Sequence, residues 1–290
     1  MTATPPWPTT SVDDILTALE PEQTGPGRFR ARNVRSGIDR TLGSQLLGLT
    51  VAVAERSRPG MTVQSLHAAF PRGGDASRPI DVSVETVQAG RSLATLQVSY
   101  RQDEREHCRA MVMLTRDEPD FLRHSAGLPD DLPGPDACEP FDCGLVPWET
   151  RAEGGEDAWR GSAGRPASID VWTRRKEVSG DRALSRQLLA HAVEAFVVPV
   201  GTLSYPSEEL LRRGGCGLSV VLSQTITFHG PFTLDGWVLL RAESVHAGRG
   251  RLHGRIQVFA DGRLAASVSA DGLLRAAAPP RALPGWSAGE

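Results

Sequence analysis

The sequence of 290 residues predicts an α+β protein made of two similar units, each with one long apolar helix followed by antiparallel strands. The first observation is an internal repeat: GSQLLGLTVAVAERS with TVQSLHAAF has the same layout as LSRQLLAHAVEAFVVPVG with LSVVLSQTITF. The second is that each helix precedes segments of period-two hydrophobicity that end at turn residues. A repeat of this length indicates a duplicated domain, because solenoid repeats are far shorter.

The two predicted helices differ at one informative position. When the Gln-Leu-Leu at 45–47 is aligned with the Gln-Leu-Leu at 187–189, Ala52 falls opposite Glu194. Carboxylates are rarely buried without a partner, so a carboxylate in only one of two apolar helices suggests a function. Glu194 is therefore the leading candidate for a general base, and a solvated polar stripe on the helix is the alternative.

The elements of each unit follow from hydrophobic periodicity and turn residues. In the first unit we expect helices at 11–19 and 43–56 and strands at 29–34, 61–70, 80–87, 93–100 and 108–115. In the second unit we expect a helix at 183–198 and strands at 141–148, 167–174, 218–228, 237–245, 250–260 and 263–274, with a surface loop at 149–166. The predicted organisation is an N-terminal domain at 11–118, a Pro/Asp-rich linker at 119–139, a C-terminal domain at 140–277 and a flexible tail at 278–290.

Bulk composition excludes several classes of protein. The formal charge of −3 provides no basic field for nucleic acid. No apolar run reaches the roughly 18 residues that a membrane helix requires, and the N-terminus does not resemble a signal peptide. The four cysteines lack the spacing of a metal site. We therefore expect a cytoplasmic protein without metal that binds neither nucleic acid nor membrane.

A helix followed by antiparallel strands, occurring twice, is typical of two hotdog domains in tandem, each with a curved sheet wrapped around its helix. The motifs of the chain resemble those of the acyl-CoA thioesterase II family, whose members have this double-hotdog fold. The matching stretches cover most of the chain: Gly43–Gly48, Val63–Phe70, Arg72–Asp75, Gly90–Ser92, Gln187–Ala192, Thr227–Phe232, Asp261–Ser267 and Asp271–Arg275.

The resemblance implies an acyl-thioester hydrolase, with an acyl-CoA or an acyl-carrier-protein thioester as substrate. It implies no metal or organic cofactor, and it implies a homodimer, in agreement with sheet edges that need covering. The family's catalytic positions are only partly retained. The helix Asp falls on Glu194, the strand Thr on Val221 and the Gln of the last strand on Ala270. The alternative is a scaffold that binds an acyl chain, or catalyses proton transfer, dehydration or cyclisation, without hydrolysis.

Further polar residues near these positions are weaker candidates. Ser223 and Thr225 follow Val221 at a spacing of two and four, so an uninterrupted strand would turn all three to one face and either hydroxyl could hold the water. Ordinary strand residues are the alternative. We expect five residues of the helix and strands to contact the substrate: His67, His191, Val221, Ala270 and Asp271. Asp271 would face the site only after a bulge or a one-residue slip.

Overall fold

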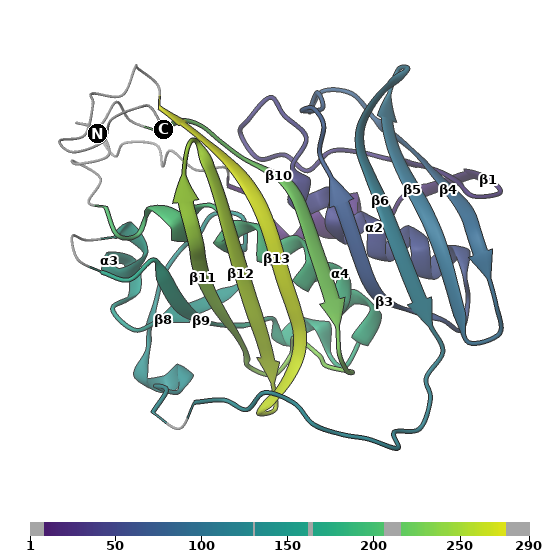
Figure 1. The fold of residues 1–290 in the computed structure, drawn as a ribbon. Helices are drawn as coiled ribbons and strands as arrows, with labels where there is room; N and C mark the ends of the chain where they lie inside the picture. Colours follow the sequence, from purple (N-terminus) through teal and green to yellow (C-terminus); the bar gives the residue numbers. More distant parts are fainter. Residues whose placement is uncertain (1–8, 130, 162–164, 206–215, 277–290) are drawn as a thin grey trace, which may run out of the picture.

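One antiparallel sheet of 13 strands forms the body of the protein (Figure 1). The structure is a computed structural model that describes residues 9–129, 131–161, 165–205 and 216–276. The strand order is β1-β2-β4-β5-β6-β3-β10-β13-β12-β11-β9-β8-β7, so each half of the chain supplies one half of the sheet. The sheets of the two predicted units are therefore joined edge to edge into one. The tail predicted at 278–290 lies outside the described residues.

The elements have the following bounds. The first half contains α1 (Val12–Ala18), β1 (Glu22–Gly25), β2 (Arg28–Ala31), α2 (Gly43–Ser57), β3 (Thr62–Ala69), β4 (Ile80–Ala89), β5 (Leu93–Gln102) and β6 (Arg105–Thr115). The second contains η1 (Pro135–Ala137), β7 (Glu139–Pro140), β8 (Glu149–Ala152), α3 (Gly155–Arg160), β9 (Ser168–Arg174), η2 (Lys176–Val178), α4 (Arg182–Ala192), η3 (Val193–Phe196), η4 (Pro199–Thr202), β10 (Cys216–Phe228), β11 (Val238–Gly248), β12 (Arg251–Ala260) and β13 (Arg263–Ala276).

The two halves meet where β3 pairs with β10. The pairing runs from Ser65 opposite Thr227 to Ala69 opposite Ser223, with His67 opposite Thr225 at its centre. In the repeat alignment His67 is the counterpart of Thr225, so each half contributes the same strand to the junction. An approximate two-fold axis therefore passes through this pair, as expected for a duplicated unit.

Helices α2 and α4 both lie on one face of the sheet, which we call the inner face; neither of them covers the opposite, outer face (Figure 1). The helices approach closely at Gly48, where a Cβ atom would lie 2.8 Å from the carbonyl oxygen of Gln187. Arg186 donates from Nε and Nη2 to both oxygens of Glu55, at 2.8 and 3.0 Å, and both side chains are largely buried. The helices are thus fixed to each other as well as to the sheet.

Three expectations about local structure are wrong. The second long helix was expected to reach residue 198, but α4 ends at Ala192 and continues as two 3₁₀ turns. Pro199 occupies the first position of the second turn, η4, where its missing N–H leaves no hydrogen bond of that turn unmade. Residues 149–166 were expected to form a surface loop, but they contain β8 and α3. Residues 141–148 were expected to form a strand, but none of them does; the short strand β7 ends just before them, at Pro140.

The described helices include none that is long and apolar enough to cross a membrane.

Candidate active site

Glu194 lies at the end of α4 and reaches the first turn of α2. It belongs to the 3₁₀ turn η3, where the Val197 amide donates to the Glu194 carbonyl at 3.3 Å. A Cβ atom on Gly43 would lie 2.7 Å from Glu194 Oε2 and 3.0 Å from Oε1. The absence of a side chain at Gly43 is therefore what allows the carboxyl group to sit against the N-terminus of α2.

The environment of Glu194 has two opposing effects on its charge. Its Oε2 atom is buried and has no hydrogen-bond partner among the described residues, although the residue as a whole is partly accessible. Burial disfavours the carboxylate and raises the pKa of Glu194 to about 8. The N-terminus of α2 carries a partial positive charge, and no described side chain caps it, so its free amides favour the carboxylate. This carboxyl group can exchange a proton near neutral pH.

The sheet below Glu194 is lined by small residues. Val197 Cγ1 lies 3.4 Å from where a Cβ atom of Gly254 would stand, and Val198 Cγ2 lies at the same distance from that of Gly272. Val221 pairs with Gly272, and Ala270 pairs with Gly254. Both predicted positions are buried on the inner face, under the segment that carries Glu194. They supply apolar surface and no polar group.

The prediction that Ser223 and Thr225 share the face of Val221 is wrong. The register of β10 against β13 shifts between Val221 and Ser223, so Leu222 is an extra residue in a β-bulge. Beyond the bulge the buried positions are the even-numbered ones, and the two hydroxyls turn to the outer face. A single extra residue reverses every later side chain, because the period of a strand is two.

Four of the predicted site residues lie on the outer face: His67, Ser223, Thr225 and Asp271. Ser223 Oγ donates to Asp271 Oδ2 at 3.2 Å, and His253 Nδ1 lies 2.9 Å from Asp271 Oδ1. His67 Nδ1 lies 2.9 Å from Thr225 Oγ1. Asp271 is exposed on the outer face, so the bulge or slip that would have turned it toward the site is not found at this residue. These polar pairs lie on the side of the sheet opposite to Glu194.

His191 lies one turn before Glu194 but is held in a different contact. Its ring is fully buried, and its Nε2 atom lies 3.1 Å from the carbonyl oxygen of Leu145. Burial lowers the pKa of His191 to about 4, so the ring is neutral at pH 7. Within the described part of the chain, no hydrogen bond joins His191 to Glu194. Its position indicates that it anchors the segment around Leu145 on α4.

Gln224 is a buried polar residue that the sequence reasoning missed. It is 1% exposed on the inner face, and neither its Oε1 nor its Nε2 atom has a partner among the described residues. Its neighbours across the two adjacent strands are Ala68 and Ala270. The repeat could have revealed it: in the alignment that matches Ser65 with Ser223, Gln224 is the counterpart of the apolar Leu66, so the second unit has a polar residue where the first has an apolar one.

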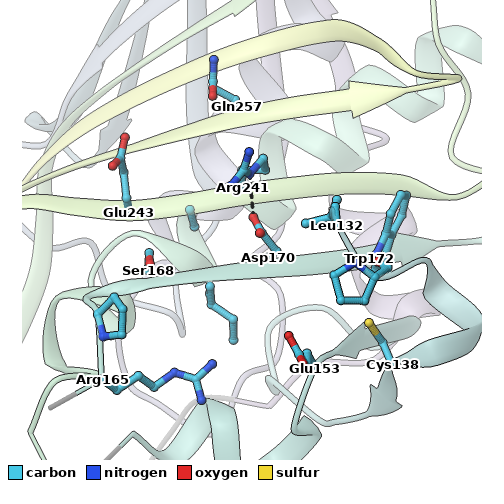
Figure 2. A pocket seen from close by; sticks show the side chains of 14 residues that line it. Leu132, Cys138, Glu153, Arg165, Ser168, Asp170, Trp172, Arg241, Glu243 and Gln257 are labelled. Carbon is cyan, nitrogen blue, oxygen red and sulfur yellow. Dashed lines mark hydrogen bonds and ion pairs between the residues drawn. The ribbon is translucent and has the colours of Figure 1, made fainter. Parts of the chain in front are cut away.

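A large cleft lies on the outer side of the second half of the sheet (Figure 2). Its volume is about 510 Å³, and its wall includes Trp172, Arg241 and Asp170. Arg241 Nε lies 2.9 Å from Asp170 Oδ1, as the dashed line in Figure 2 marks. The cleft is on the face opposite to Glu194 and is separate from the candidate active site. No cluster of three or more His, Cys, Asp or Glu side chains that could hold a metal ion occurs in the described ranges.

Comparison with known proteins gives matches over most of the chain. The model of the acyl-CoA thioesterase N-terminal domain matches residues 35–115, and that of the acyl-CoA thioesterase C-terminal domain matches residues 119–272. Human acyl-coenzyme A thioesterase 8 is 25% identical over 90% of this chain and 88% of its own length. Acyl-CoA thioesterase 2 of Haemophilus influenzae is 25% identical over 91% of this chain and 98% of its own length.

Solved structures have the same fold. A TesB protein of Mycobacterium avium subspecies paratuberculosis superposes with a TM-score of 0.76, at 24% identity, over 91% of this chain and all of its own (100%). A hotdog-fold protein of Alicyclobacillus acidocaldarius superposes with a TM-score of 0.69, at 17% identity, over 90% of this chain and 98% of its own. The predicted double-hotdog α+β fold is thereby confirmed. Because the two family models together match most of its length, the chain belongs to the acyl-CoA thioesterase family.

Proposed function

We propose that this protein hydrolyses acyl thioesters with a water molecule that Glu194 activates. The observation that carries the proposal is the buried carboxyl group of Glu194 against the open N-terminus of α2. It occurs in only one of the two units, since the first unit has Ala52, in α2, at the equivalent position. Family membership supports hydrolysis over the alternative of a scaffold that only binds acyl chains.

The reaction follows from the two groups that meet at Glu194. The carboxylate takes a proton from water, and the resulting hydroxide equivalent attacks the thioester carbonyl carbon. The free amides in the first turn of α2 are suited to stabilise the negative charge that develops on the carbonyl oxygen. When the tetrahedral intermediate collapses, the C–S bond breaks and the thiolate leaves. The proton on Glu194 passes to sulfur, so that one water and one thioester give a carboxylic acid and a thiol.

The environment of Glu194 suits both proton transfers. A base must be deprotonated before attack, and the same group must hold the proton until the thiolate leaves. A pKa of about 8 meets both needs better than the ordinary pKa of a glutamic acid, which is too low for the proton to be held. The apolar positions Val221 and Ala270 leave the water without a hydroxyl or amide from those two residues.

The substrate class is an acyl thioester of coenzyme A. The relatives from human and Haemophilus influenzae are named acyl-CoA thioesterases, and this chain aligns over most of the length of each. A carrier-protein thioester contains the same reacting bond, so it is the second substrate to assay. The homodimer, the cytoplasmic location and the domain limits at 119–139 stay predictions.

Thiol release from a panel of acyl-CoAs tests the proposal. We expect wild type to release thiol and Glu194→Gln to lower kcat by about 10²–10⁴, the usual contribution of a general base. The matched control is Glu85→Gln, which makes the same change at an exposed position of β4 and should leave kcat unaltered. Absence of thiol release by wild type from every CoA and carrier-protein thioester would refute hydrolysis. Full activity in Glu194→Gln would refute only the assignment of the base.

A further inference from the structure

Gln224 is buried in the middle of the sheet with its amide group unused by the fold. The residue is 1% exposed, and both polar atoms of its side chain lack partners among the described residues. Nearly all buried polar groups in proteins are hydrogen-bonded, because an unpaired one destabilises the folded state. An unpaired amide at the centre of a sheet therefore needs an explanation other than stability.

The neighbours of Gln224 leave its side chain free to project from the sheet. Ala68 on β3 and Ala270 on β13 lie directly opposite it, and Ala270 in turn pairs with Gly254 on β12. Val197, three residues after Glu194, packs on Gly254. The segment that carries Glu194 thus lies over the row of small residues to which Gln224 belongs. Gln224 is buried on the face that helices α2 and α4 cover, and the carboxyl group of Glu194 lies against the first turn of α2.

The duplicated unit supplies an internal control. The counterpart of Gln224 in the first unit is Leu66, which is also 1% exposed, and the counterpart of Glu194 is Ala52. The fold therefore accommodates an apolar residue at each of these positions. Both polar replacements occur in the second unit, one in the inner face of the sheet and one in the segment that lies over it.

We infer that Gln224 is a substrate-contacting residue of the hydrolase, whose side-chain carbonyl accepts a hydrogen bond from the attacking water while Glu194 accepts the other. This inference rests on the proposed hydrolysis. A water held by two acceptors has both of its protons fixed, so its lone pair is directed at the thioester carbon. The Nε2 group of Gln224 is then free to donate to the carbonyl oxygen of the substrate, since an amide accepts and donates at once.

The test compares two apolar variants of Gln224 with a matched control. Gln224→Met retains the length of the side chain, and Gln224→Leu introduces the residue of the first unit. Gln257→Met makes the same change at an exposed position of the outer face. For each protein, kcat and KM for thiol release from acyl-CoA and the melting temperature are measured.

We expect both Gln224 variants to lower kcat by about 10²–10³, the effect of removing one preorganised polar group, with little change in KM. Their melting temperatures should equal or exceed that of wild type, because an unpaired buried amide is removed. Gln257→Met should stay within about twofold of wild type. A purely structural role predicts a lower melting temperature without a selective loss of kcat.

The outcomes separate this inference from the proposed function. Undiminished kcat in folded Gln224→Met and Gln224→Leu overturns the inference and leaves hydrolysis standing. Loss of folding in both variants also overturns it, since the amide would then serve the fold. Absence of thiol release by wild type overturns the proposed function and this inference together.

Discussion

Replacement of Glu194 by glutamine should remove a pH dependence of stability that wild type has between about pH 4.5 and pH 8. The pKa of Glu194 is about 8 in the folded protein and has the ordinary value of 4.5 in the unfolded chain. Between these values the folded protein holds a proton that the unfolded chain has released. Raising the pH therefore favours unfolding over this whole window, and the effect levels off above pH 8.

The size of the effect follows from the shift. Each pH unit inside the window lowers the free energy of unfolding of wild type by about 1.4 kcal/mol, or about 3 kcal/mol between pH 5 and pH 7. The α2 N-terminus stabilises the carboxylate by about 0.3–1 kcal/mol, which is too little to reverse the sign. Glutamine has no such proton equilibrium. Between pH 5 and pH 7 the free energy of unfolding of the variant should therefore rise by about 3 kcal/mol relative to that of wild type, which corresponds to roughly 6–12 °C in melting temperature.

Urea and thermal unfolding of both proteins at pH 5, 6, 7 and 8 measure this difference. The other titratable groups affect wild type and variant alike, so they cancel in the comparison. Glu85→Gln, at an exposed position, should run parallel to wild type over the same range. If the free energies of unfolding of Glu194→Gln and wild type changed in parallel with pH, the raised pKa of a buried carboxyl group would be refuted. The same would follow if wild type became more stable relative to the variant as the pH rises.

Three further predictions concern the face of the sheet, the helix pair and the first turn of α2. Ser223→Ala should change kcat/KM for thiol release less than about twofold, because the hydroxyl lies on the outer face; a large loss would place it in the site. Arg186→Met should lower the free energy of unfolding in urea by about 3–5 kcal/mol, since it leaves the largely buried carboxylate of Glu55 without its cation; a loss below about 1 kcal/mol would contradict this. Gly43→Ala should lower kcat with a smaller effect on melting temperature, because a Cβ atom would lie 2.7 Å from Glu194 Oε2; unchanged kcat would contradict the site geometry.

The assembly is a separate prediction. Light scattering at micromolar concentration should give about twice the mass of the 31.2 kDa chain. A mass equal to that of one chain would refute the expected homodimer.

The repeat explains why so much of the architecture could be predicted from the sequence. A duplicated helix with its strands specifies two equivalent units, and their pairing through β3 and β10 follows from that equivalence. The repeat also isolated Glu194, because comparison with Ala52 removes the background of ordinary core positions. An internal duplication thus acts as a control within one sequence: apolar positions shared by both units indicate packing, and differences indicate function.

The strand faces could not be predicted, because the bulge is a property of pairing. Counting by two from Val221 places Ser223 and Thr225 inward, whereas the extra residue Leu222 turns Gln224 inward in their place. The first unit has the same irregularity, with a register shift around Gln64, the counterpart of Leu222. Neither bulge contains a glycine or another marker in the sequence, and only the register of the neighbouring strands reveals it.

The pH dependence of thiol release tests the central claim most directly. If Glu194 is the base, kcat/KM for an acyl-CoA should rise about tenfold per pH unit below pH 8 and level off near it, because only the carboxylate accepts the proton of water. Glu194→Gln should abolish this rise together with most of the rate. A profile that is flat from about pH 6 to pH 9, or one that survives unchanged in Glu194→Gln, would contradict the account.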